Sequence, residues 1–238
     1  MDQSQQETTP QLHRKFWTNP LTVLFGAVTL FLLSEITAVV VLSLAGLSLE
    51  SVTNATLFFY SLVKLLSFGW LLAVVQRLLK FSWRGLGFSR PTWKAVFSVL
   101  PVFAIYVVIS GILMFLATRL IPGFDVEQTQ NIGFKDVAQT RELIMTGATL
   151  VLVVPLVEEL LFRGVLFHGL RRRLPFWLST IVVSVVFAAA HGQWNVAVDT
   201  FALSIILCWL TERSRSVVPA ILLHMLKNAI AFTILFVV

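Results

Sequence analysis

The sequence contains a single cysteine, Cys208, and few charged residues. One thiol cannot form an intrachain disulfide, and it excludes any chemistry that needs two sulfurs in one chain. Asp, Glu, Lys and Arg make up 13% of the residues, whereas a soluble domain carries about a quarter. No basic face with aromatic or groove-reading elements is evident, so a nucleic-acid partner is not expected. The sequence therefore argues against a soluble domain and excludes a disulfide framework.

Long apolar runs take the place of the missing charge. Hydrophobic residues make up 57% of the chain, and the mean hydropathy is +0.87. A membrane-spanning helix needs about 20 predominantly apolar residues. We therefore predict an all-α membrane protein, a polytopic bundle of about seven (seven to eight) transmembrane helices with an intramembrane polar site. The expected spans are residues 21–46, 54–76, 95–118, 143–168, 176–191, 196–210 and 217–237.

Lysine and arginine are concentrated in alternate connections. Short connections rich in Lys and Arg stay in the cytoplasm. The basic segments are Arg14–Lys15, the connection 77–94, Arg171–Arg172–Arg173, and Arg213 with Arg215. Seven spans with a cytoplasmic N-terminus satisfy all of these segments at once. The compact chain fits a multi-pass protein of the bacterial cell (inner) membrane.

The N-terminal segment Met1–Pro20 is polar. It lacks the apolar core and the small-residue cleavage site of a secretory signal, so the first span is expected to remain as an anchor. We divide the chain into four expected regions: a cytoplasmic tail at 1–20, N-terminal transmembrane helices at 21–118, a non-cytoplasmic connection at 119–142, and a transmembrane region carrying the polar motifs at 143–238.

Two adjacent carboxylates interrupt the fourth apolar run. Glu159 and Arg163 lie four residues apart, which places them on one helix face where they can form a buried ion pair. Glu158 points elsewhere and shares its face with Phe162 and Val165. A carboxylate without a local partner in an apolar setting takes up a proton more readily, which suits a general base. The bland alternative is a salt-bridge cluster at the end of the helix.

Further polar residues occur in the later spans. Phe187 and His191 share one helix face, and His224 and Asn228 share another. Ionisable groups within a span cost at least about 2.5–3.5 kcal/mol each, so they usually face the bundle interior and mark function. Imidazole and amide N–H groups directed at one point could hold an oxyanion or orient a water molecule. Similar polar clusters also occur in transporters and proton relays.

Three motifs in this order resemble a known family. Glu-Glu-x-x-x-Arg at 158–163, Phe-x-x-x-His at 187–191 and His-x-x-x-Asn at 224–228 look like the signatures of the CPBP intramembrane glutamic endopeptidases. That family includes the type II CAAX prenyl endopeptidases and the Abi-like bacteriocin-processing and immunity proteins. The resemblance covers roughly residues 142–232, which makes 143–238 the expected catalytic region.

The resemblance implies an intramembrane endopeptidase without a cofactor. Glu158 would be the base that activates water, and His191 would bind or orient that water. His224 and Asn228 would stabilise the oxyanion. The supporting residues would be Glu159, Arg163 and Phe187. The sequence departs from the family's usual pattern at Cys208, where a small residue is usual, and at Arg215, where Gly is frequent.

Other functions stay open at this point. Two His and one Glu form a known catalytic zinc set, so a metal-dependent protease using the same cluster is an alternative, although His-Glu-x-x-His is absent. A non-catalytic immunity or regulatory membrane protein of the same fold is another, and a transporter is a third. The expected partners are the lipid bilayer and a membrane-anchored protein or peptide substrate. The oligomeric state does not follow from the sequence.

Three further features bear on the site. Glu35 and Lys64 lie within the first two runs, and we expect them to form an intramembrane ion pair. Asp199 could orient His191 or face the non-cytoplasmic surface. At about 1.5 Å per residue, Glu158 and His191 lie roughly twice as far from the cytoplasmic arginines as His224 lies from Val217. The predicted site therefore requires the last span to be displaced or strongly tilted.

Overall fold

The computed structural model describes residues 19–46, 53–79, 82–126, 128 and 140–237. Within these ranges the chain is helical, without a β-strand, and each predicted span coincides with a helix. The prediction of an all-α membrane bundle is confirmed. The elements are α2 (Pro20–Leu44), α3 (Asn54–Leu79), the 3₁₀ turn η1 (Trp83–Leu86), α4 (Trp93–Phe97), α5 (Val99–Leu120), α6 (Thr140–Gly147), η2 (Ala148–Val153), α7 (Val154–Glu159), η3 (Leu160–Phe167), α8 (His168–Arg171), α9 (Phe176–Ala189), α10 (Trp194–Ser214) and α11 (Val218–Phe236).

Most of the predicted spans meet the length that a membrane requires. Among the described residues, five helices are long and apolar enough to cross one: α2, α3, α4 together with α5, α10 and α11. The apolar helix α9 is shorter, with 14 residues. The elements α6 to α8 follow one another without a break from Thr140 to Arg171. We call this segment the central helix.

The outer surface of the bundle is apolar. Large side chains such as Phe25, Trp70 and Leu120 are exposed by 68%, 66% and 75%. Soluble monomers rarely expose contiguous apolar patches of more than a few hundred Å². In a membrane the same side chains contact lipid acyl chains, which are equally apolar, so their exposure carries no free-energy penalty. This explains why the sequence carries so little charge.

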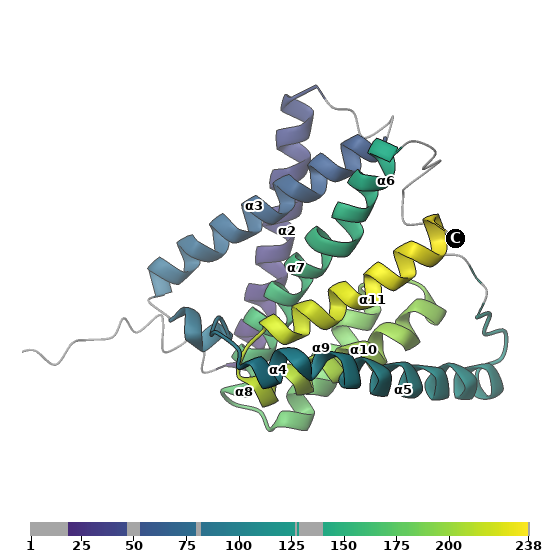
Figure 1. Cartoon of the computed structure of the whole chain (residues 1–238). Helices are drawn as coiled ribbons and strands as arrows, with labels where there is room; N and C mark the ends of the chain where they lie inside the picture. The colour runs from purple at the N-terminus through teal and green to yellow at the C-terminus, as the bar shows by residue number, and fades with distance from the viewer. Residues whose placement is uncertain (1–18, 47–52, 80–81, 127, 129–139, 238) are drawn as a thin grey trace, which may run out of the picture.

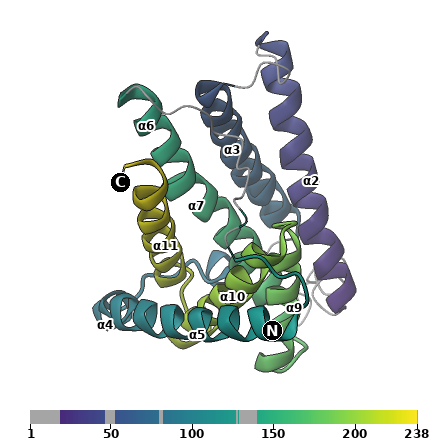
Figure 2. The same ribbon diagram turned by 90° about the vertical axis from the view of Figure 1, so that its right-hand side faces the viewer.

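The interior is centred on α10. In its apolar 18-residue stretch, 56% of the helix is buried, against 28% or less in the corresponding stretch of each of the other four long apolar helices. Figure 2 shows α10 behind α5, with α9 and α11 on its two sides. Side chains of α10 such as Leu203 and Leu207 are completely buried. This helix therefore forms the platform against which α9, α11 and the central helix pack.

The predicted basic connections meet at one end of the bundle. The Val217 amide donates to the Gly87 carbonyl (3.0 Å), and the Ser216 hydroxyl donates to the Ser89 carbonyl (2.7 Å). Arg171 forms a two-point ion pair with Glu212, with nitrogen–oxygen distances of 2.7 and 3.1 Å. In Figure 1 the helices converge at this end and spread apart toward the other.

The opposite end is joined by the connection after α5. The Asn195 amide donates to the carbonyls of Val126 (3.3 Å) and Gln128 (2.8 Å). Half of the predicted connection 119–142, and the predicted tail 1–20 as far as residue 18, lie outside the described residues. Successive connections thus lie at alternate ends of the bundle, as their charges predict. Which end faces the cytoplasm stays a prediction.

The central helix is π-helical in two stretches, η2 and η3, on either side of α7. Within η2 the Val154 amide donates to the Thr149 carbonyl, five residues earlier. Pro155 follows immediately, and a proline inside an α-helix clashes with the carbonyl four residues before it. The wider π turn relieves that clash, and π-bulges of this kind frequently mark functional sites. The acidic pair lies in α7, directly between the two stretches.

Candidate active site

Glu159 and Arg163 form a buried ion pair, as their spacing predicts. Arg163 Nη1 lies 2.9 Å from Glu159 Oε1, and neither side chain is exposed. Arg163 also donates through Nη2 to the Ser204 carbonyl of α10 (3.3 Å). Removing one partner from a buried pair leaves an uncompensated charge. Through its contact with Ser204, Arg163 also ties the central helix to α10. The Glu159 carboxylate is thus fully buried and engaged through Oε1.

His224 reaches the acidic pair from α11. Its Nδ1 atom lies 2.9 Å from Glu159 Oε1, and its Nε2 atom lies 3.7 Å from Glu158 Oε2. An ionised carboxylate only accepts hydrogen bonds, so Nδ1 carries a hydrogen and donates a hydrogen bond to Glu159. The opposite edge of the ring, with Nε2, is therefore directed at Glu158. His224 is almost completely buried.

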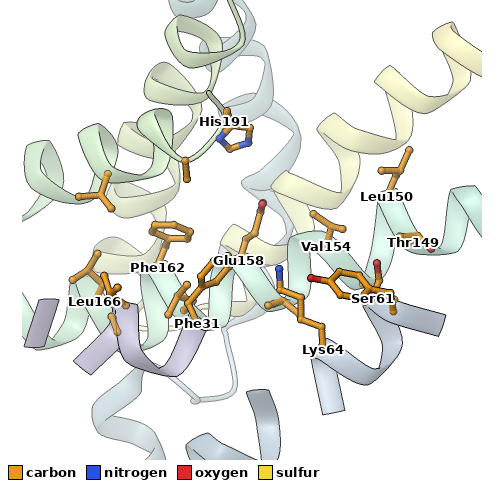
Figure 3. A pocket seen from close by; sticks show the side chains of 18 of the residues that line it. Phe31, Ser61, Lys64, Thr149, Leu150, Val154, Glu158, Phe162, Leu166 and His191 are labelled. Atoms are coloured by element: carbon orange, nitrogen blue, oxygen red, sulfur yellow. The ribbon is translucent and has the colours of Figure 1, made fainter. Parts of the chain in front are cut away.

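Glu158 is the more accessible carboxylate of the two. A quarter of its side chain is exposed, and it faces a cavity of about 540 Å³ that His191 also lines. Figure 3 shows the Glu158 carboxylate extending toward the His191 ring. The cavity is walled mainly by apolar side chains of α2, α3, the central helix and α9. It lies within the range of about 300–1,000 Å³ that small-ligand pockets occupy.

The tautomer of His191 follows from its backbone contact. Nδ1 lies 2.8 Å from the Phe187 carbonyl oxygen. A carbonyl oxygen accepts but cannot donate, so Nδ1 is the protonated nitrogen. In the neutral ring this leaves Nε2 as a hydrogen-bond acceptor.

Phe187 packs at the centre of the predicted site residues. Its ring is fully buried and lies 5.0 Å from the His191 ring and 6.0 Å from the His224 ring, measured between centroids. The Arg163 guanidinium carbon lies 4.7 Å from the same centroid, which is a cation–π distance. One aromatic ring thus fixes the spacing of side chains from three helices.

Asn228 lies apart from the acidic pair. Its Nδ2 atom donates to the Leu150 carbonyl in η2 (2.8 Å), and it is not among the residues that line the cavity. In the π-helical pattern of η2, the Leu150 carbonyl would accept from residue 155. Pro155 has no N–H to give. Asn228 therefore satisfies a carbonyl that the proline leaves without its helical donor.

The last span is displaced as the predicted site required. Ser216 and Val217 are 0% and 1% exposed, because the connection 82–92 covers them. The start of α11 is therefore covered by that connection, and α11 runs alongside the central helix, packing against α6, η2 and α7 and converging with it toward the α8 end (Figure 1). His224 consequently meets Glu159 despite its short distance from the start of its helix. The structure thus brings Glu158, Glu159, His191 and His224 to one region.

The fold forms two further ion pairs within the apolar helices. Glu35 and Lys64 form the predicted ion pair, and Tyr60 donates a hydrogen bond to Glu35. The Asp199 side chain is about a quarter exposed, and its contacts are with α5 and α11 rather than with His191. It accepts from Tyr106 (2.6 Å) and Ser110 (2.5 Å) of α5 and pairs with Lys227 of α11 (3.5 Å). Tyr106 and Ser110 are four residues apart, a spacing that places both hydroxyls on one face of α5.

The two departures from the family pattern have different structural settings. Cys208 is completely buried within the core of α10, as a small apolar residue would be. Arg215 ends α10 with φ = 53°. This left-handed conformation favours glycine, which explains why Gly is suited to that position.

The described residues contain no group of three or more His, Cys, Asp or Glu side chains arranged to hold a metal ion. The Nδ1 atoms of His224 and His191 contact protein oxygens, Glu159 and the Phe187 carbonyl respectively, so Nε2 is the nitrogen of each ring that could act on a ligand. Glu158 and His191 both line the mainly apolar cavity.

The C-terminal part of the chain is similar to known proteins. Residues 140–230 match the family model "Type II CAAX prenyl endopeptidase Rce1-like". An Escherichia coli protein named "Uncharacterized 24.3 kDa protein" is 33% identical over 89 residues, 35% of this chain and 41% of that protein. The Bacillus subtilis (strain 168) protein named "Putative membrane peptidase YdiL" is 26% identical over 106 residues, 44% of this chain and 42% of that protein.

The similarity is confined to part of each molecule. The chain matches less than half of the length of these two curated relatives. No solved structure matches the chain. The resemblance predicted from the three motifs is therefore confirmed over residues 140–230, where the chain matches the Rce1-like type II CAAX prenyl endopeptidase family.

Proposed function

We propose that this protein is an intramembrane endopeptidase that hydrolyses a peptide bond in a membrane-associated protein or peptide. The observation that carries the proposal is the placement of Glu158 and His191 on the wall of one cavity between the helices. Glu158 has no cation on its own helix turn, because Arg163 is held by Glu159. The name of the Bacillus subtilis relative, "Putative membrane peptidase YdiL", agrees with this reading.

A water molecule between Glu158 and His191 is the nucleophile in this mechanism. The Glu158 carboxylate and His191 Nε2 are both acceptors, so each accepts a hydrogen bond from the water. A lone pair on the water oxygen is then free to attack the substrate carbonyl carbon. As the new carbon–oxygen bond forms, the water proton passes to Glu158. Glu158 then returns a proton to the amide nitrogen as the carbon–nitrogen bond breaks. General acid–base catalysis of this kind contributes about 10²- to 10⁴-fold in rate.

His224 and the buried pair support this chemistry. The contact between His224 and Glu159 holds the ring with Nε2 toward Glu158. We take the ring in its doubly protonated form, in which Nε2 also donates, and assign His224 to the oxyanion that forms on the substrate carbonyl. Asn228 acts in this proposal as a positioning residue, because its amide is engaged by the Leu150 carbonyl.

The proposal is tested in two stages. Comparison of protein termini in the membranes of a deletion strain and its parent identifies a candidate substrate. Purified protein in lipid nanodiscs should then cleave that substrate, and Glu158→Gln should lower the rate by about 10²- to 10⁴-fold. Glu212→Gln is the matched carboxylate-to-amide control outside the site, and it should retain the wild-type rate.

The folding of Glu158→Gln is checked by its thermal unfolding, which should match wild type closely. Full activity in a folded Glu158→Gln variant would contradict the mechanism. If a cellular phenotype survives both Glu158→Gln and His191→Ala, the protein acts by binding, as an immunity or regulatory membrane protein, rather than by catalysis.

A further inference from the structure

The cavity that holds Glu158 also contains one fixed positive charge. Among the described residues that line it, Lys64 is the one lysine or arginine and Glu158 the one carboxylate. Lys64 belongs to α3, outside the region that matches the family. In Figure 3 the side chains of His191, Glu158 and Lys64 follow one another across the cavity.

The contacts of Lys64 present its charge to the cavity. Its partner Glu35 is not among the lining residues, whereas Lys64, Tyr60 and Ser61 are. Lys64 therefore faces the cavity, whereas its carboxylate partner does not line it. An ammonium group has three N–H donors. Glu35 occupies part of this capacity, and the Phe31 ring lies 4.5 Å from Nζ.

Glu35 does not depend on Lys64 alone. The Tyr60 hydroxyl also donates a hydrogen bond to it. About a fifth of the Lys64 side chain is exposed, so this pair is not sealed between helices as Glu159 and Arg163 are. Partly exposed ion pairs contribute little to stability, and ionisable residues within a membrane usually mark function. Stability alone therefore gives no reason for a lysine on this wall.

We propose that Lys64 is a specificity-determining residue that binds a carboxylate carried by the membrane-embedded substrate. This inference rests on the proposed function for the identity of the occupant. The cavity is otherwise mainly apolar, and an unpaired carboxylate in such surroundings is strongly disfavoured. Lys64 supplies the missing partner.

The same charges fix the orientation of the bound segment. Glu158 repels a substrate carboxylate, whereas Lys64 attracts it, so the carboxylate lies at the α3 side of the cavity. A cationic group in the substrate would instead pair with Glu158 and occupy the base. The preferred substrate segment is therefore apolar, carries one carboxylate, and lacks lysine and arginine.

The binding test needs no cleavage and no known substrate. A photoreactive alkyl carboxylate and its matched primary amide are titrated against the protein in phosphatidylcholine nanodiscs, and labelling of the cavity residues is measured by mass spectrometry. Wild-type protein and Glu158→Gln should both bind the carboxylate more tightly than the amide, on the order of 10- to 100-fold, as expected for a hydrogen bond to a charged group.

The decisive variant removes both charges of the pair. Lys64→Met alone would leave Glu35 uncompensated and repel an anion, so Glu35→Gln is combined with Lys64→Met. The carboxylate and amide probes should bind this double variant equally. Asp199→Asn combined with Lys227→Met removes the other intramembrane pair, which does not line the cavity, and should keep the wild-type preference. Lys64→Arg should keep it as well.

Each outcome decides between the possibilities. Equal binding of the two probes to wild type, or an unchanged preference in the Glu35→Gln/Lys64→Met variant, overturns the role of Lys64. An alkyl phosphate that binds more tightly than the carboxylate assigns the site to a lipid headgroup and overturns the substrate assignment. A Lys64-dependent preference in a protein that cleaves no peptide overturns the proposed function and leaves carboxylate binding by Lys64 established.

Discussion

Glu159 and His224, 65 residues apart in the sequence, are joined by a 2.9 Å contact between Oε1 and Nδ1. Because Arg163 binds the same oxygen, one buried atom ties the central helix to α11 and, through Arg163, to α10. The neighbouring carboxylate of Glu158 is left to face the cavity. Two adjacent residues of one type are thereby given different tasks by their surroundings.

This division predicts that the same Glu→Gln substitution lowers stability far more at one position than at the other. Glu159→Gln leaves Arg163 buried without its counter-charge and should lower the free energy of unfolding by about 3–5 kcal/mol. Glu158→Gln should lower it by less than about 1 kcal/mol, because Glu158 is a quarter exposed. The measurement is denaturant unfolding of the purified protein in mixed micelles. The combination Glu159→Gln/Arg163→Met should cost less than the sum of the single changes; equal effects of the two glutamate variants would contradict the assignment.

The contact between Asn228 and the Leu150 carbonyl predicts a rescue. Asn228→Ala should destabilise the protein by about 1–3 kcal/mol, since it leaves a carbonyl without a donor. Pro155→Ala restores a backbone N–H that can reach the same carbonyl. In the Pro155→Ala background, Asn228→Ala should therefore cost clearly less. Double-mutant analysis of unfolding free energies measures the coupling, and strictly additive effects would show that Asn228 does not compensate for the proline.

Arg215 should be replaceable by the residue that its backbone favours. A left-handed conformation costs an L-residue about 1–2 kcal/mol, while glycine loses roughly 0.5–1 kcal/mol through its freer unfolded chain. Arg215→Gly should therefore raise stability by up to about 1 kcal/mol. Arg213→Gly, within the last turn of α10, is the matched control and should lower stability by about 1 kcal/mol. Thermal unfolding of the two variants, measured side by side, distinguishes them in sign.

Metal dependence gives a fourth prediction. Because the proposed mechanism uses Glu158 and His191 to activate water without a metal, strong chelators should leave peptidase activity unchanged. The rate of substrate cleavage is measured after prolonged dialysis against a chelator, with a known zinc protease as the positive control for metal removal. Loss of activity that zinc restores would favour the metal-dependent alternative.

Much of the fold was accessible from sequence, because hydrophobic runs of membrane length leave few alternatives. The positions of the helices, the alternation of basic connections and the pairing of Glu159 with Arg163 all depend on local spacing. The pairing of Glu35 with Lys64 was predictable for a related reason, since two opposite charges within apolar runs each need a partner.

What the sequence alone determined is thus the set of helices, the residues that carry charge within them, and which carboxylate its own helix neutralises. The tertiary structure decided where those residues meet. It placed α11 beneath the connection 82–92, so that His224 reaches Glu159, and it directed Asp199 to Tyr106 and Ser110 rather than to His191. It also set Lys64 on the same cavity wall as Glu158. Such contacts depend on crossing angles and on where each helix begins in depth, and hydropathy along a single chain records neither.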